Sequence, residues 1–469
     1  MAAGRESMHG QWSSRWIFIL AATGSAVGLG NIWRFPYVTG ESGGGAFVLV
    51  YLLCVLLVGL PIMIAEILLG RRGRRSPINT MAALADDEGL SPNWRFLGWM
   101  GVLAGFVILS FYSVVAGWSL AYVFYVAVGT FSDAGLEDAQ ATFAALTGSA
   151  GQLALWHTVF MVMTVVVVAR GVKGGLEQAV KYLTPALFGM LIAMVGYALI
   201  SGDAAAGIRY LFAPDFSKIS GDTVLAALGQ AFFSLSLGMG SIMIYGSYLS
   251  NDASIAETAG IIALADTLVA LLAGIAIFPV VFGYGLEPGQ GPGLVFMTLT
   301  IAFGHMPGGQ FFGTLFFLLL TVAAWTSAIS LLEPVVAWLV ESLGWGRVKS
   351  AIVGGGAAWL LGFGSLLSFN HLADFTPGGR SFFDWSEFLS TSVFLPLGGM
   401  LIAVFAGWRM RLASTMEEFG SGPSSLYRGW LGLVLFVAPV GVAVVFLEGT
   451  GLRAVIVAWL GALATSLFG

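Results

Sequence analysis

The sequence predicts an all-α polytopic membrane protein, and three observations support this fold class. First, 58% of the 469 residues are hydrophobic and only 10% are charged, whereas in a soluble protein roughly a quarter of all residues are charged. Second, apolar runs of about 17 to 25 residues recur along the chain, and each is long enough to cross a bilayer. Third, two of these runs carry a Gly-x-Gly break at mid-span, Gly28–Gly30 and Gly238–Gly240.

Eleven membrane-spanning helices are expected, with a twelfth candidate at the C-terminal end. The expected spans lie near 16–40, 46–69, 97–128, 153–169, 177–200, 224–249, 258–285, 311–343, 349–369, 386–408 and 429–447. The twelfth, 452–468, has about 17 residues, the lower limit for crossing, so that it either spans thinly or lies in the interface.

The distribution of Lys and Arg predicts a cytoplasmic N-terminus, because cytoplasmic segments carry an excess of these residues. In this orientation 14 of the 20 Lys and Arg residues lie on the inside and 4 on the outside. The cluster Arg71–Arg75 borders a span, and we interpret it as a topology anchor rather than a nucleic-acid-binding patch. The single cysteine, Cys54, excludes an intrachain disulfide, and the four histidines are too far apart in sequence to form a short-spaced metal-ligand pair.

With this topology the two Gly-broken helices, spans 1 and 6, run in opposite directions. Two five-span units of opposed topology, 1–200 and 201–409, are what an inverted-repeat transporter needs, and 410–469 would add helix 11 and the short twelfth candidate. Unwound backbone inside a membrane is tolerated only around a cavity or a packed interior. Matched breaks in the two halves therefore point to a binding site at the membrane midplane.

The segment Gly24–Pro36 is expected to unwind in the middle of span 1. Gly24, Gly28 and Gly30 each weaken a helix by about 1 kcal/mol relative to Ala, and Pro36 ends or kinks the helix around it. A break frees carbonyls, which suit Na⁺, and N–H groups, which suit a carboxylate. The alternative is close helix packing through Gly24 and Gly28, but the second break and the polar Asn31 favour a site.

Polar side chains accompany the second break and the neighbouring spans. Gln230, Ser234 and Ser236 approach the break, although serines in apolar helices also bond their own backbone. Asp266 lies inside span 7 without a basic neighbour in sequence, so that a cation or a proton must neutralise it.

Two further polar positions lie inside or at the edge of the membrane. The adjacent hydroxyls of Thr326 and Ser327 in span 8 suit an alkali cation, with interhelical hydrogen bonding as the alternative. Arg34 is a costly charge whose expected partner is Glu387, unless it snorkels to the outer headgroups.

At these residues the chain resembles the neurotransmitter:sodium symporter family, which has the leucine-transporter fold. The resemblance covers nearly the whole chain and is carried by Trp12, Arg15, Gly24–Pro36, Glu41–Phe47, Tyr51, Tyr112, Trp118, Gln230–Gly240, Thr326, Ser327, Glu333 and Pro334. It implies a bacterial-type secondary active symporter in the inner (plasma) membrane, which couples uptake of an amino acid to Na⁺ by alternating access. Its partners would be the amino acid, sodium and membrane lipid, and not nucleic acid.

The resemblance also implies two sodium ions and no organic cofactor. Sodium site one would use Ala26, Asn31, Ser234 and Asp266, where many members have Asn in place of the last. Sodium site two would use Gly24, Val27, Ala323, Thr326 and Ser327.

The implied substrate site surrounds both breaks. It would comprise Ser25, Ala26, Gly28, Leu29, Gly30, Ile108, Tyr112, Phe233, Ser234, Ser236, Met239 and Leu331. The substrate carboxylate would meet the N–H groups of Leu29 and Gly30 and the Tyr112 hydroxyl. Monoamine carriers have Asp at the position of Gly28, so this glycine indicates an amino acid. Because Met239 and its neighbours are apolar, we expect a neutral hydrophobic or aromatic substrate.

The resemblance implies gates and ion dependence as well. Arg34 and Glu387 would form the outer pair, and Trp12, Tyr248 and Glu341 the inner gate. The inner-gate Arg of the family is His9 here, and Arg5 is an alternative to it.

Chloride-requiring members have Ser at the position of Ala270, and Asp266 lies one turn away. We therefore expect chloride independence, with proton counter-transport through Asp266 as a second expectation. Two alternative functions compete with symport. One is a sensor that binds amino acid and sodium with little transport, and the other is a membrane enzyme, for which the sequence shows no catalytic constellation.

Overall fold

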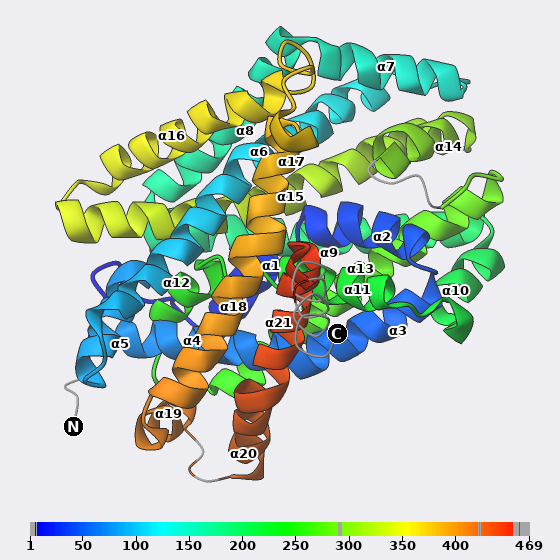
Figure 1. The fold of residues 1–469 in the computed structure, drawn as a ribbon. Coiled ribbons are helices and arrows are strands. Elements are labelled where there is room, and N and C mark those ends of the chain that lie inside the picture. Colours follow the sequence, from blue (N-terminus) through cyan, green and yellow to red (C-terminus); the bar gives the residue numbers. More distant parts are fainter. Residues whose placement is uncertain are drawn as a thin grey trace.

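The computed structural model describes residues 7–288, 293–420 and 424–453, together with Arg5, Gly422 and Trp459. Within these residues the chain consists of helices and connecting turns, without strands, and the long helices pack as one bundle (Figure 1). Helices α7 (Leu136–Gly148) and α14 (Leu299–His305) lie at one end of the bundle, and α5 (Pro77–Asp87) and α19 (Leu412–Phe419) lie at the other. The all-α prediction is confirmed.

The remaining α-helices are α1 Arg15–Ala26, α2 Phe35–Glu41, α3 Gly45–Cys54, α4 Leu60–Gly73, α6 Arg95–Ala127, α8 Ala150–Ala169, α9 Glu177–Ser201, α10 Ala204–Phe212, α11 Gly221–Ser234, α12 Ser241–Ser247, α13 Ile255–Gly283, α15 Gly309–Leu343, α16 Arg347–Leu367, α17 Phe382–Phe388, α18 Leu395–Val404, α20 Ser425–Gly432 and α21 Ala438–Gly449. Short π-helical segments are η1 Gly30–Arg34, η2 Val55–Gly59, η4 Val172–Leu176, η6 Leu294–Thr298, η8 Leu389–Phe394, η9 Phe405–Arg409 and η10 Leu433–Val437, and single 3-10 turns are η3 Pro92–Trp94, η5 Phe216–Lys218 and η7 Pro377–Gly379.

Nine helices of the described part of the chain are long and apolar enough to cross a membrane, and α1 with Gly30–Glu41 makes a tenth if this pair, bent by 48°, is one span. The nine are Gly45–Gly73, Pro92–Ala127, Ala150–Ala169, Val172–Ser201, Ile255–Gly283, Gly309–Leu343, Arg347–Leu367, Phe382–Arg409 and Ser425–Gly449. Helices α11 and α12 occupy the place of the expected sixth span and are separated by residues 235–240. The segment 452–468 falls largely outside the described residues, so that the total of eleven or twelve crossings and the inverted repeat stay predictions.

Both expected breaks are present, and their backbone geometry differs. Helix α1 ends where Val27 adopts an extended conformation (φ −73°, ψ 103°), and the chain becomes helical again as the π-helical η1. Between α11 and α12 the chain instead turns through positive φ at Ser236 (54°), Gly238 (76°) and Gly240 (76°). Glycine adopts this region without penalty, whereas a residue with a Cβ pays about 1–2 kcal/mol. The backbone is therefore strained at Ser236, whereas Gly238 and Gly240 adopt the same region without strain.

The broken helices lie inside the bundle. Helix α1 packs on α9, α13 and α15, while α12 packs on α4, α15 and α1. The longest helices, α6 and α15, pack along each other and flank these central segments (Figure 1). This arrangement removes the interrupted backbone from lipid, as unwound segments within a membrane require.

Close packing of α12 on α4 depends on small residues at their crossing. A Cβ added to Gly246 would lie 2.9 Å from the Ile67 carbonyl oxygen and 3.0 Å from its Cα, which are backbone atoms that cannot rotate away. We predict that Gly246→Ala lowers the melting temperature of the detergent-purified protein by several degrees, since overpacking costs about 1–3 kcal/mol. Gly189→Ala in α9, where a Cβ meets no atom within 4 Å, is the matched control and should melt like the native chain. Equal melting of the two variants would contradict this account of the crossing.

Candidate functional site

The two breaks lie against each other, and side chains complete the hydrogen bonds of their exposed backbone. Gln230 Nε2 donates to the Gly30 carbonyl (2.7 Å), and the Ser236 hydroxyl donates to the Ser25 carbonyl (3.0 Å). From α4, the buried Glu66 carboxylate accepts the Gly238 N–H (2.5 Å). Since water cannot reach these groups in the membrane interior, each such bond fixes the position of one break.

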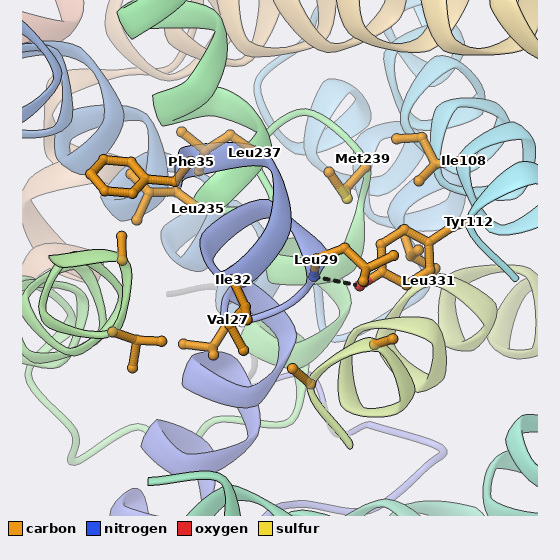
Figure 2. Close-up of a cluster of buried hydrophobic side chains, with 14 of the residues drawn as sticks. Val27, Leu29, Ile32, Phe35, Ile108, Tyr112, Leu235, Leu237, Met239 and Leu331 are labelled. Atoms are coloured by element: carbon orange, nitrogen blue, oxygen red, sulfur yellow. Dashed lines mark hydrogen bonds between the residues drawn. The ribbon is translucent and has the colours of Figure 1, made fainter. Parts of the chain in front are cut away.

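A small cavity of about 20 Å³ lies between the breaks. Its lining residues come from α1, η1, α6, α11, the second break and α15, and they are Ser25, Ala26, Gly28, Gly30, Ile108, Tyr112, Phe233, Ser236, Met239, Ser327 and Leu331. Figure 2 shows Ile108, Met239, Tyr112 and Leu331 on the same side of the first break, around Leu29. The cavity thus has an apolar wall facing the backbone of the first break.

The hydrogen bond that joins α6 to the first break runs from Leu29 N–H to the Tyr112 hydroxyl oxygen (3.1 Å; Figure 2). The phenol also makes a hydrogen bond with the Ser327 side chain on α15. Tyr112 also lines the cavity. An N–H group of the break and a phenol O–H therefore lie together, which suits an anionic oxygen.

A first cluster of polar groups surrounds Asp266, which is fully buried on α13. The Asn31 amide donates to Asp266 Oδ1 (2.8 Å), and the Ser234 hydroxyl donates to Asp266 Oδ2 (2.6 Å). The Tyr51 hydroxyl lies 3.3 Å from Ser234 Oγ. No Lys or Arg of the described chain forms an ion pair with Asp266, so that the charge compensation this carboxylate needs must come from a cation or a proton.

A second cluster of oxygen atoms joins α1 to α15. The Ser327 hydroxyl lies 3.0 Å from the Ser25 carbonyl and 3.4 Å from the Val27 carbonyl, and the Thr326 hydroxyl lies 3.0 Å from the Ala323 carbonyl. A Cβ on Gly24 would lie 3.4 Å from Thr326 Cβ, so these helices are in contact at this glycine. Neutral carbonyl and hydroxyl oxygens of this kind are hard ligands that suit Na⁺.

The structure brings most of the sequence-predicted residues together. All but two of the residues expected around the substrate line the cavity. The exceptions are Leu29, whose N–H donates to the cavity-lining Tyr112, and Ser234, which lies in the Asp266 cluster. Most of the expected sodium ligands fall into the two oxygen clusters, whereas Ala26, expected at sodium site one, lines the cavity. Their roles as ligands stay predictions.

The predicted outer pair is not formed in this structure. No ion pair within 4.0 Å joins Arg34 to Glu387 among the described residues, and the Arg34 guanidinium instead lies over the Phe233 ring, 5.0 Å from its centroid. Tyr37 interacts electrostatically with both Arg34 and Glu387. The two charges therefore flank a common tyrosine without direct contact, and the outer gate remains a prediction.

At the opposite end, the structure decides which residue faces Glu341. His9 Nε2 lies 2.9 Å from Glu341 Oε1, and both side chains are only 4% exposed. Arg5, the alternative, pairs with Asp87 instead (2.6 Å), and the choice of inner-gate residue stays a prediction. Trp12 is buried beside Tyr248 and donates its indole N–H to the Tyr245 carbonyl (3.1 Å).

Sequence reasoning missed three contributors to this region. Glu66 is a charged residue inside an apolar run, a signal that could have identified it. Thr184 of α9 donates to the Leu20 carbonyl (3.2 Å) and faces Gly24, and Ser330 accepts a hydrogen bond from the Ser25 hydroxyl (2.7 Å). Nothing in the local sequence distinguishes Thr184 or Ser330 from other hydroxyl residues in apolar helices.

Comparison with known proteins identifies the family. The profile of the sodium:neurotransmitter symporter family matches residues 9–136 and 135–450. The chain belongs to this family. An uncharacterized sodium-dependent transporter of Bacillus subtilis is 38% identical over 451 residues, which cover 94% of this chain and 98% of that protein. An uncharacterized sodium-dependent transporter of Haemophilus influenzae is 35% identical over 447 residues, covering 93% and 97%.

A solved structure of the family shares the fold. The crystal structure of MhsT in complex with L-phenylalanine matches with a TM-score of 0.87 and 45% sequence identity, covering 95% of this chain and 100% of that chain. The predicted family and its fold are thus confirmed. The relatives are sodium-dependent transporters rather than enzymes.

Sodium binding can be tested at Ser327, whose hydroxyl bridges two carbonyls of the first break. A ligand that binds only the folded state raises its stability in proportion to the logarithm of ligand concentration. We predict that the native protein melts at a higher temperature in NaCl than in KCl, and that Ser327→Ala reduces this difference by half or more, a rough estimate from the loss of one ligand.

Ser365→Ala on α16 is the matched control for this measurement. Its hydroxyl is also buried and has no hydrogen-bond partner among the described atoms. The control should keep the full difference between sodium and potassium. A full difference in Ser327→Ala would instead place sodium elsewhere.

Proposed function

We propose that this protein is a sodium-coupled symporter that imports a neutral hydrophobic or aromatic amino acid by alternating access, independently of chloride. The observation that carries the proposal is the cavity between the two breaks. One wall offers the Leu29 N–H and the Tyr112 hydroxyl, which suit a carboxylate, and the other is formed by Ile108, Met239 and Leu331. Family membership supports coupling to sodium.

The cavity supports an α-amino acid over an amine that lacks a carboxylate. A Cβ on Gly28 would lie 2.6 Å from the Tyr112 hydroxyl oxygen, and the Ser327 hydroxyl lies closer still. A longer side chain, such as an Asp that replaces the substrate carboxylate in amine carriers, would fit only if the Ser327 and Tyr112 side chains moved. This supports a substrate that itself supplies the carboxylate.

The apolar wall supports a hydrophobic side chain on that amino acid. Among the described residues that line the cavity there is no Lys, Arg, Asp or Glu, so a charged substrate side chain would be buried without a partner, at a high cost in free energy. Met239 is flexible and fits side chains of different shapes. The structure of MhsT with L-phenylalanine shows an aromatic amino acid in complex with a protein of the same fold.

The driving force is sufficient for uphill import. A sodium ion that crosses about 100 mV gains about 2.3 kcal/mol, and a tenfold concentration gradient adds about 1.4 kcal/mol. Together they support accumulation of a zwitterion by roughly several hundredfold per ion. The two halves, 1–200 and 201–409, would supply the moving units, with the N-terminus in the cytoplasm of a bacterial plasma membrane.

Uptake into proteoliposomes tests the proposal. We expect an inward sodium gradient to drive uptake of radiolabelled leucine, phenylalanine or tryptophan, and unlabelled members of this set to compete. Replacing chloride by gluconate should leave the rate unchanged, and replacing sodium by potassium should abolish it. Preference for glutamate or lysine, or uptake without sodium, would overturn the proposal. Binding of amino acid and sodium with no uptake would support a sensor instead.

Chloride independence is assigned to Asp266. Asp266→Asn retains the shape of the side chain but removes the negative charge that compensates sodium, so we predict a half-saturating sodium concentration raised roughly tenfold or more, or a new stimulation by chloride. Sodium titrations of uptake in chloride and in gluconate measure both effects.

Asp374→Asn, at an exposed position in an outer loop, is the control and should leave both unchanged. An Asp266→Asn variant with native sodium and chloride responses would contradict this role. Proton counter-transport through Asp266 stays a prediction.

A further inference from the structure

The segment before α1 is fastened to five other elements. We call Arg5 and residues 7–15 the strap. Three of its side chains face carboxylates: Arg5 pairs with Asp87 on α5, His9 with Glu341 on α15, and Arg15 with Glu257 on α13. Trp12 donates its indole N–H to the Tyr245 carbonyl in α12 and its backbone N–H to the Tyr248 carbonyl at the C-terminal end of that helix. The Ser13 hydroxyl donates to Glu177 on α9. The strap therefore closes one end of the bundle, the end that the topology places in the cytoplasm.

Among these links, His9 to Glu341 is built around a carboxylate that does not depend on the strap. Glu341 also accepts the Ser76 N–H (2.7 Å), the Ser76 hydroxyl (2.6 Å) and the Asn79 amide (2.8 Å). None of these three donors belongs to the strap. Loss of the His9 contact would therefore leave Glu341 with three hydrogen-bond donors.

His9 differs from the other links in its response to pH. Arginine stays charged throughout the physiological range, and the Trp12 and Ser13 donors are neutral. Histidine is the side chain whose charge ordinarily changes between about pH 5 and 8. Because both His9 and Glu341 are nearly buried, the strength of their contact depends on whether the imidazole carries a charge.

The charges that face His9 leave Glu341 as its partner. The Tyr248 ring lies 5.9 Å away and its hydroxyl donates to Glu333, which pairs with Arg347. Arg5 and Asp87 pair with each other. Within the described chain, no Lys or Arg pairs with Glu341. Protonation of His9 therefore turns a hydrogen bond between a neutral imidazole and a carboxylate into an ion pair.

We propose that His9 is a pH-sensitive latch of the inner end: its protonation holds the strap and α1 against α15, and its deprotonation eases their release. The latch rests on one part of the proposed transport cycle, namely that α1 moves when the inner end opens. Where the family has an arginine, which is always charged, this chain has a histidine. An acidic cytoplasm would then slow inward opening, and an alkaline cytoplasm would speed it.

Thiol accessibility of α1 tests the latch without measuring transport. In a Cys54→Ser background, Ala22→Cys places a reporter at a fully buried position of α1. The rate of its reaction with a polar methanethiosulfonate reagent is measured at about pH 6 and about pH 8. Each rate is divided by that of the same protein carrying His9→Arg, so that the pH dependence of the thiol chemistry cancels.

We expect the normalised rate to rise roughly two- to tenfold from about pH 6 to about pH 8 when His9 is present. With His9→Gln, which keeps a hydrogen-bond donor but has no charge, the rate should be high at both pH values. His371→Gln in an exposed outer loop is the matched control and should keep the native profile.

Two results would overturn the latch. One is a normalised rate that does not change with pH in the native chain, and the other is a native pH profile in His9→Gln. If His9→Gln does not fold, the pH dependence of the thiol reaction rate in the native chain, compared with that in His9→Arg, still tests the latch. Because the reporter needs no substrate, failure of amino-acid uptake would overturn the proposed function and leave this result standing.

Discussion

The structure depends on one constraint: backbone N–H and C=O groups inside a membrane must find partners within the protein. Two helices break this rule locally, at Val27–Leu29 and at residues 235–240. Side chains of neighbouring helices satisfy the exposed groups, among them Gln230, Glu66 and Tyr112. The helices that supply these partners must surround the breaks, and this requirement places the cavity in the middle of the bundle.

The two breaks contribute different chemistry because their backbones differ. The first is extended at Val27 and presents an N–H group beside a phenol, which is a polar contact of fixed direction. The second turns through positive φ on either side of Met239 and so places a flexible apolar side chain in the cavity. In the proposed function, the first break would recognise the backbone of the amino acid, and the second would adapt to its side chain.

The two ends of the bundle are closed to different degrees. At the end that carries the strap, ion pairs, a buried tryptophan and the His9–Glu341 contact hold the strap in place. At the opposite end Arg34 lies over Phe233 and forms no ion pair with Glu387. The proposed alternation between two openings needs ends whose contacts form and break separately, and in this structure more of these contacts are formed at the end that carries the strap.

The sequence by itself determined the helical membrane class, the expected spans, both breaks and the family, because hydrophobic length, glycine pairs and a run such as Gly24–Pro36 are local properties. The resemblance to the family also named most residues that line the cavity. The tertiary structure decided the partners: His9 rather than Arg5 faces Glu341, Glu66 holds the second break, and Arg34 is apart from Glu387. His9 and Glu341 are 332 residues apart, and such pairs depend on how helices pack and on sub-ångström side-chain geometry, which no local pattern contains.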